Sequence, residues 1–256
     1  MFLSLLSEPT EFIQMNTNHL TNSSLPEGTT LFRFNGVPVK VQPAFWPIPF
    51  LVTGVLTWIA GLRQPDRSWL QRLVVGLAAL PVALFAEIGH AMAHTVSARL
   101  AEARMDEILL SAEMTRTLYE NNDVLPHVHI LRSLGGPIFS LICVTLSLLW
   151  RSLSPRNSIS RELAETSLVG HGFILLGSVA PLPMVDGGTI LKWRLVQSGR
   201  SVEQADRAVH RASWGLGAAL LVAGAVLRIF QKRKLAGGGL AAGGLAAIAA
   251  GMGLLK

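Results

Sequence analysis

The chain contains 256 residues, of which 50% are hydrophobic and only 15% are charged, and its mean hydropathy is +0.44. Charged residues make up about a quarter of a soluble domain, so this composition argues against a disordered chain and a nucleic-acid binder. The net charge of +6 arises without a dense basic run, which favours charges flanking membrane segments. Cys143 is the only cysteine, which excludes intramolecular disulfides and cysteine-based zinc sites.

The first 30 residues are mostly polar after a short apolar start and predict a flexible lead-in. The start lacks a basic segment and a nearby small-residue cleavage site, so no signal peptide is expected. Residues 31–44 alternate apolar and polar side chains around Gly36-Val37-Pro38. This pattern predicts a short β-hairpin or extended segment before the first membrane helix.

Six long segments with few or no charges follow. A helix needs about 20 apolar residues to cross a bilayer, and six such runs are hard to reconcile with buried helices of a soluble protein. The sequence therefore predicts an all-α polytopic membrane protein with about six transmembrane helices. The predicted spans are residues 45–62, 71–97, 132–151, 166–192, 212–230 and 235–255.

The polar loop and the last predicted span allow further structural predictions. In the polar loop at 98–131, a helix is predicted from Leu100 to Glu120, followed by an extended segment before the third span. The last span contains Gly239 and Gly243, at the spacing that lets two membrane helices approach closely. These glycines indicate either helix–helix self-association or a weakly apolar tail helix. Basic residues divide almost equally between the two sides of the membrane, slightly favouring the amino-terminal side as cytoplasmic.

Three ionisable residues lie in the second predicted span. An ionisable residue in a bilayer costs about 2.5–3.5 kcal/mol on insertion scales, so it indicates function. At 100° per residue, Glu87, His90 and His94 fall at about 0°, 300° and 340° and share one helix face. Imidazole is the commonest metal ligand, and a neighbouring carboxylate can be a ligand or a general base. The face is therefore expected to carry metal or proton chemistry; the alternative is a polar stripe against another helix.

A second polar constellation lies in the fourth predicted span, where Pro181 and Pro183 break the helix before Asp186. Irregular backbone at membrane depth requires cover from protein or a water-filled cavity. A carboxylate there needs a partner, and His90 or a metal ion is the natural candidate; the alternative is an Asp that caps the next helical turn. His171 is left out of the site; His127 or His129 could reach a metal from the loop, but a surface role is favoured for both.

These motifs resemble the site-2 proteases, a family of membrane-embedded zinc metalloproteases. Ala86–His90 (AEIGH) is similar to the His-Glu-x-Gly-His helix of that family, and Ser178–Gly188 (SVAPLPMVDGG) is similar to its Asn, proline turn and Asp-Gly motif. Gly136–Ser140 (GPIFS), expected to open the third span, is similar to its Gly-Pro motif followed by Asn. The likeness spans residues 31–195 and implies a three-helix core, with residues 196–256 as a helical extension.

The resemblance implies a zinc ion held by His90 and Asp186, with Glu87 as the base that activates water. It also assigns substrate binding to four residues in the last two motifs: Gly136, Pro137, Ser140 and Ser178. Ala86 stands where the family has its first His, and Ser140 and Ser178 stand where it has Asn. His90 and His94 are themselves four residues apart, so a shifted zinc site of His90, His94 and Asp186 is a second hypothesis.

Three functions are compatible with these residues. An intramembrane zinc protease would hydrolyse peptide bonds of membrane-spanning substrates. A catalytically inactive pseudoprotease would bind membrane helices in the same cleft, as the departures at Ala86, Ser140 and Ser178 favour. A small proton-coupled transporter would explain the buried Glu, His and Asp but not the ordered motifs. The expected location is the inner membrane of a bacterium, and the expected partners are a transmembrane protein and the bilayer.

Overall fold

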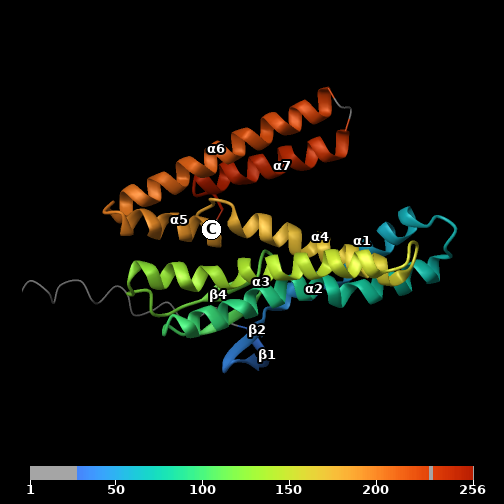
Figure 1. The fold of residues 1–256 in the computed structure, drawn as a ribbon, viewed down its shortest axis with the longest axis horizontal. Helices are drawn as coiled ribbons and strands as arrows, with labels where there is room; N and C mark the ends of the chain where they lie inside the picture. Colours follow the sequence, from blue (N-terminus) through green and yellow to red (C-terminus); the bar gives the residue numbers. More distant parts are fainter. Residues whose placement is uncertain (1–27, 231–232, 256) are drawn as a thin grey trace, which may run out of the picture.

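The computed structural model describes residues 28–230 and 233–255 (Figure 1). Within these ranges the chain folds into seven α-helices, a short 3-10 helix η1 (Pro43–Phe45) and a four-stranded sheet. The mostly helical class and the small sheet before the first long helix confirm the predicted fold class. All but the last three residues of the predicted lead-in, 1–30, lie outside the described part of the chain.

The predicted hairpin forms from β1 (Thr29–Phe34) and β2 (Val37–Val41), which pair antiparallel. Its turn is Asn35-Gly36, with φ of 51° and 82°, the left-handed backbone that favours Asn and Gly in two-residue hairpins. The turn therefore lies before the expected Gly36-Val37-Pro38, because Val37 and Pro38 already belong to β2. Pro38 is tolerated there because β3 pairs only with Val39–Val41 of β2.

The helix predicted from Leu100 to Glu120 is wrong. The second long helix ends at Leu100, and the chain then forms β3 (Glu107–Leu110) and β4 (Arg116–Leu118). β3 pairs parallel with β2 and antiparallel with β4, giving the order β1-β2-β3-β4. Ile108, Leu109 and Leu110 are all fully buried, and a short run that is buried on both faces shows neither helical nor strand periodicity.

Five helices are long and apolar enough to cross a membrane, which makes the chain an integral membrane protein. Three of them match predicted spans closely: α1 (Pro47–Arg63), α2 (Trp69–Leu100) and α7 (Lys234–Gly251). A fourth, α6 (Val202–Ile229), begins well before its predicted span at 212–230. The fifth, α3 (Pro126–Leu153), begins before its predicted span, so the expected extended segment is helical and Pro137 lies inside α3 rather than at its start. Pro126 occupies the first turn of α3 and needs no hydrogen-bond donor there.

The predicted span at 166–192 is two helices, α4 (Ile159–Val179) and α5 (Asp186–Gln197). α4 is not among the five spanning candidates, and its first turns carry Arg161, Glu162 and Glu165. Irregular backbone joins α4 to α5 at Pro181 and Pro183, where the sequence predicts a break. The expected six spans are therefore five apolar helices and a broken α4–α5 pair.

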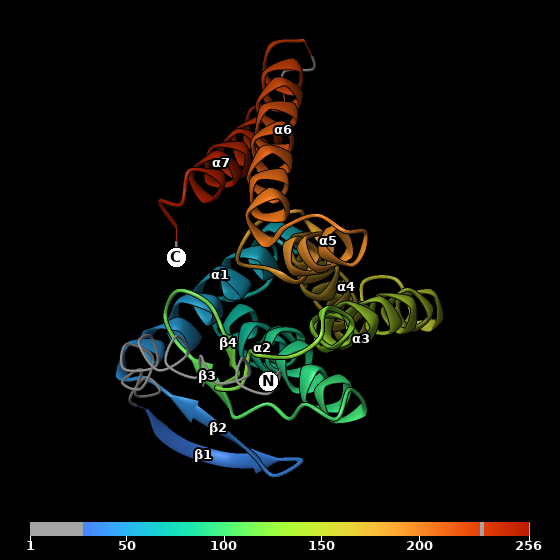
Figure 2. The same cartoon turned by 90° about the vertical axis from the view of Figure 1, so that its left-hand side faces the viewer.

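Helices α2, α3 and α4 pack against one another as a three-helix core (Figure 1). α1 packs on α2, and α5 lies against α3. The sheet covers the late half of α2, where Val39, Phe45 and Ile108 form a buried cluster with Ala91 and Ala98. The α6–α7 hairpin projects away from this core and meets it mainly through α5 (Figure 2).

The α6–α7 hairpin is held by glycines that let the two backbones approach closely. A Cβ on Gly244 would lie 2.7 Å from the carbonyl oxygen of Gly217, and one on Gly237 would lie 2.6 Å from that of Gly224. The predicted pair takes no part in this contact: Gly239 faces open space, and Gly243 meets only a Leu220 methyl at 3.9 Å. Self-association through Gly239 and Gly243 stays a prediction.

We expect Gly244→Leu to lower the free energy of unfolding in detergent by about 1–3 kcal/mol, because the new side chain collides with the α6 backbone. The matched variant Gly239→Leu should leave it unchanged. Thermal unfolding of the purified chain measures both. Equal losses in the two variants would contradict this packing.

Candidate metal centre

The site is built from two helices whose local sequence fixes the positions of its polar side chains. Glu87, His90 and His94 share one face of α2, as the helical spacing predicts. Asp186 is the first residue of α5, directly after the proline turn that ends α4. A carboxylate in the first turn is favoured by the helix dipole. The turn therefore brings Asp186 back to α2 at the depth of the two histidines.

Three side chains converge at this point. The Nε2 atom of His90 lies 3.2 Å from Oδ2 of Asp186, and the Nε2 atom of His94 lies 3.4 Å from Oδ1. The two Nε2 atoms lie 3.3 Å apart. One donor atom from each of the three residues falls within 4.8 Å of the others. This is the trio of the shifted site, which the spacing of His90 and His94 suggests.

The second ring nitrogen, Nδ1, of each histidine also has a hydrogen-bond partner. Nδ1 of His94 donates to the carbonyl oxygen of Arg132 at 2.8 Å, and Nδ1 of His90 lies 2.9 Å from Oγ of Ser140. Because a carbonyl can only accept, a neutral His94 has its lone pair on Nε2, directed at Asp186. Such hydrogen bonds from the second ring nitrogen orient metal-binding histidines in proteins.

These residues fit a divalent metal ion. Two imidazole nitrogens and one carboxylate are a common protein ligand set for catalytic zinc, which keeps a further position for water or substrate. Their ligand atoms face one another at 3.2–3.4 Å, and a cation or a shared proton among them offsets the repulsion between the carboxylate and an imidazole lone pair. Burial strengthens this repulsion, since His94 is only 4% exposed.

Gly136 explains how α3 can lie against this group. A Cβ at this position would overlap Nε2 of both His90 and His94. Only a glycine therefore lets the α3 backbone approach the two rings closely enough for Arg132 and Ser140 to bind them. Gly136 and Pro137 are buried between helices and do not line the cavity described below.

Glu87 lies one turn before His90 and is held by the sheet. Its Oε1 atom accepts two hydrogen bonds from Thr115, from the hydroxyl at 2.6 Å and from the backbone N–H at 3.1 Å. Thr115 precedes β4, so the β3–β4 connection fixes the position of this carboxylate. The sequence gives no signal for this partner, because the region was predicted to be helical.

A cavity of about 730 Å³ opens beside these residues. Glu87, His90, His94 and Asp186 line one part of it, and β4 with its preceding loop lines another. Ser178, the only predicted substrate-binding residue in the lining, donates to the carbonyl oxygen of Leu175 at 3.1 Å. The cavity therefore joins the predicted base, the three converging donors and an extended strand.

Ser140 is fully buried and does not line the cavity, so its expected role in holding substrate is not supported by its position. Its hydroxyl instead fixes the ring of His90. The side chain of Arg132, which sequence reasoning did not select, holds the surrounding loops by donating to the carbonyl oxygens of Ala103 and Asn121. Its guanidinium also lies 4.3 Å from the ring centre of Tyr119, whose hydroxyl pKa is raised by burial.

The three histidines left out of the predicted site lie outside the converging group, although His129 is buried and does not have the expected surface role. His129 is buried and stacks on Trp193 with ring centres 3.9 Å apart. His127 is exposed in the first turn of α3. His171 is buried on α4 against the edges of Phe85 and Phe139. Ala86, where the family has its first His, is fully buried and faces Gly170 of α4 rather than the three donors.

No protein-family model matches this sequence, and no curated protein is significantly similar to it. Among solved structures, the chain is similar to the site-2 protease from Methanocaldococcus jannaschii, with a TM-score of 0.52 and 15% sequence identity. The similarity covers 89% of this chain and 94% of that protein. The chain has a site-2-protease-like fold. At this identity the likeness establishes the fold, and the chemistry depends on the residues of this chain.

We expect Gly136→Ala to weaken zinc binding by about 10- to 100-fold, the range seen when groups that orient metal ligands are disturbed. The added methyl group would displace both imidazole rings. Gly177→Ala is the matched control, because nothing lies within 4 Å of a Cβ there. Zinc titration of the purified chains measures both affinities, and equal affinities in the two variants would contradict this account of Gly136.

Proposed function

We propose that the chain is an intramembrane zinc metalloprotease with a shifted metal site. His90, His94 and Asp186 would hold the ion and Glu87 would act as the base. The convergence of these three donors beside Glu87 in one cavity carries the proposal. The site-2-protease-like fold supports it, since the site lies where α2 of the three-helix core meets the turn before α5.

Each residue has a distinct role in peptide hydrolysis. Bound zinc supplies Lewis-acid chemistry, polarising a peptide carbonyl and making water a nucleophile near neutral pH. Glu87 accepts the proton of the attacking water and passes it to the leaving nitrogen, so that a C–O bond forms as the C–N bond breaks. Thr115 holds Oε1 of Glu87, which leaves Oε2 as the atom that takes the proton.

The substrate would be a membrane-spanning protein whose helix is unwound where it enters the cavity. A helical segment has its backbone groups paired internally, whereas cleavage requires an accessible carbonyl. β4 is an edge strand of the sheet and lines the cavity, and an edge strand is the place where an extended segment can add to a sheet. We place the protein in the inner membrane of a bacterium.

The alternative is a pseudoprotease that binds membrane helices without cutting them. Ala86 and Ser178, which replace a ligand and a substrate-holding Asn of the family, favour it. Ionisable groups at membrane depth oppose it, because Glu87 and Asp186 are costly in a bilayer without a function. The two functions share the cavity and differ in whether Glu87 has chemistry to perform.

Zinc content tests the shifted site. We expect near-stoichiometric zinc in the detergent-purified chain when zinc is supplied and no chelator is used. His94→Ala and Asp186→Asn should each lose most of it, because each removes one of three ligands. His127→Ala, which removes an exposed histidine, should keep it. Elemental mass spectrometry gives the metal per chain, and no zinc in the parent chain would overturn the metalloenzyme proposal.

Glu87→Gln separates the protease from the pseudoprotease. Loss of the general base should lower cleavage of a transmembrane substrate by about 10²- to 10⁴-fold. Zinc content and helix binding should remain, because Glu87 is not among the converging donors. Unchanged cleavage would contradict the assignment of the base, and helix binding without cleavage in the parent would favour the pseudoprotease.

A further inference from the structure

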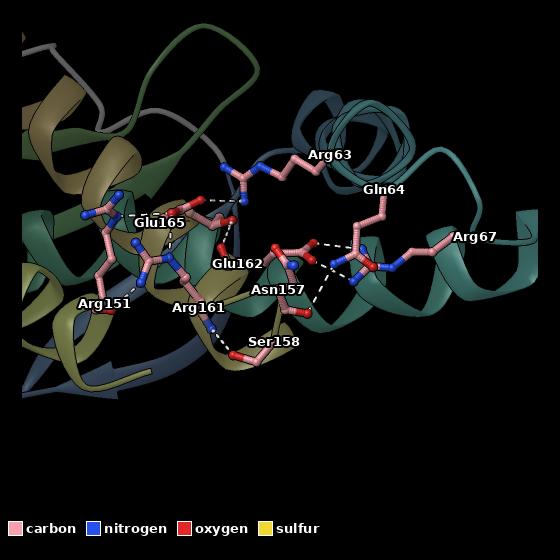
Figure 3. Close-up of polar contacts among 10 residues, drawn as sticks. Arg63, Gln64, Arg67, Arg151, Asn157, Ser158, Arg161, Glu162 and Glu165 are labelled. Carbon is pink, nitrogen blue, oxygen red and sulfur yellow. Dashed lines mark hydrogen bonds and ion pairs between the residues drawn. The ribbon is translucent and has the colours of Figure 1, made fainter. Parts of the chain in front are cut away.

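The opposite end of the helical core carries a cluster of arginines that the proposed protease does not use. It is formed by the turn between α1 and α2 and the turn between α3 and α4 (Figure 3). Along α2, Trp69 is about 30 Å from His90 at 1.5 Å per residue. The cluster is therefore remote from the candidate metal centre, and its role is independent of proteolysis.

Three tryptophans mark this end as a membrane–water interface. Trp58 near the end of α1, Trp69 at the start of α2 and Trp150 near the end of α3 are 63%, 70% and 37% exposed. Tryptophan gathers at the level of the lipid headgroups, where its ring meets the acyl chains and its N–H meets polar groups. The arginines of the two turns thus lie at headgroup level.

Two contacts tie the turns to each other. Arg67 binds Glu162 with two hydrogen bonds of 2.9 and 2.6 Å, and the side chain of Gln64 donates to the carbonyl oxygen of Asn157 at 3.1 Å (Figure 3). A bidentate pair fixes the planar guanidinium in one orientation. The turn between α1 and α2 and the turn between α3 and α4 therefore form one rigid surface.

This surface has fewer carboxylates than guanidinium groups. The single carboxylate of Glu165 forms ion pairs with Arg63, Arg151 and Arg161, at nitrogen–oxygen distances of 3.2, 3.1 and 3.4 Å (Figure 3). Arg156 has no acidic partner within the described part of the chain. Each guanidinium has five N–H donors, so most of those around Glu165 remain available. The surface is left with an excess of positive charge and of unused donors.

Two cavities open where this charge is concentrated. One of about 340 Å³ is lined by Arg63, Arg156 and Arg161 together with Glu162 and Glu165, which already bind arginines. Another of about 810 Å³ is lined by Arg63 and Arg67 together with one carboxylate, that of Asp66. Gln64 and Asn157 line both, so the cavities meet at the contact between the turns. Their shared wall offers the planar donor forks that match the oxygens of a phosphate.

An apolar groove continues from this surface into the membrane. It runs between α1 and α2, has a volume of about 1110 Å³, and is lined by Trp58, Leu62 and Leu77. Pro65 lines both the groove and the larger arginine cavity. A molecule with a charged head and an acyl chain would fill the cavity and the groove together.

The geometry points to a binding site for the phosphate headgroup of an anionic membrane phospholipid at these two turns, with an acyl chain in the α1–α2 groove. The excess of arginine matches the negative charge, and basic pockets between transmembrane helices are known to hold anionic headgroups. The lipid would hold α1 and α2 against α3 and α4 at the end remote from the metal centre.

The test uses the full-length chain in mixed micelles with equal amounts of phosphatidylglycerol and phosphatidylcholine. Native mass spectrometry reports which lipid the protein retains, and we expect phosphatidylglycerol to be preferred. Arg156→Gln should reduce this preference about five-fold, the effect of one basic residue at a membrane surface. The double variant Arg63→Gln/Arg161→Gln should reduce it further.

Arg200→Gln is the matched control, because Arg200 is exposed between α5 and α6 at the other end. It should keep the preference of the parent chain. Thermal unfolding in phosphatidylcholine alone shows whether a variant is folded, and Arg156→Gln breaks no ion pair found in the described residues. The site is overturned by equal retention of both lipids in the parent, by an unchanged preference in the Arg156 and double variants, or by the same loss in the control.

Displacement of phosphatidylglycerol by inorganic phosphate at equal concentration would instead identify a free-phosphate site.

Discussion

The close approach of α2 and α3 at Gly136 is the contact on which the candidate metal centre depends. Because Gly136 has no side chain, the α3 backbone lies against the rings of His90 and His94. Arg132 and Ser140, one turn to either side, then reach the Nδ1 atoms and turn both Nε2 atoms toward Asp186. A larger residue at position 136 would separate the helices and remove both hydrogen bonds at once.

Much of the site follows from local sequence. The positions of Glu87, His90 and His94 on one face of α2 depend only on helical periodicity, and the break before Asp186 depends only on the prolines. The convergence of Asp186 with both histidines does not follow from either pattern, because it depends on how α4 and α5 pack beside α2. The spacing of His90 and His94 suggests a shifted site, whereas Asp186 could be named as the third donor only from the resemblance to the Asp-Gly motif of the site-2 proteases.

The parts that sequence reasoning missed share one physical origin. β3 is a short run buried on both sides, so neither alternation nor a helical stripe marks it, and its pairing with β2 joins residues far apart in the chain. Because the sheet was not predicted, the hydrogen bond from Thr115 to Glu87 was not predicted either.

Helix α2 links the two ends of the molecule. It spans about 48 Å at 1.5 Å per residue, long enough to carry the proposed metal ligands near one end and to begin at the arginine-rich turn after α1. At its start, the bidentate bond between Arg67 and Glu162 joins it to α4; near its end, the sheet and Gly136 hold it against α3. Asp186 approaches His90 from the far end of α4, so the depth of Asp186 relative to the α2 histidines depends on the packing of α4 against α2 and α3 and of α5 against α3.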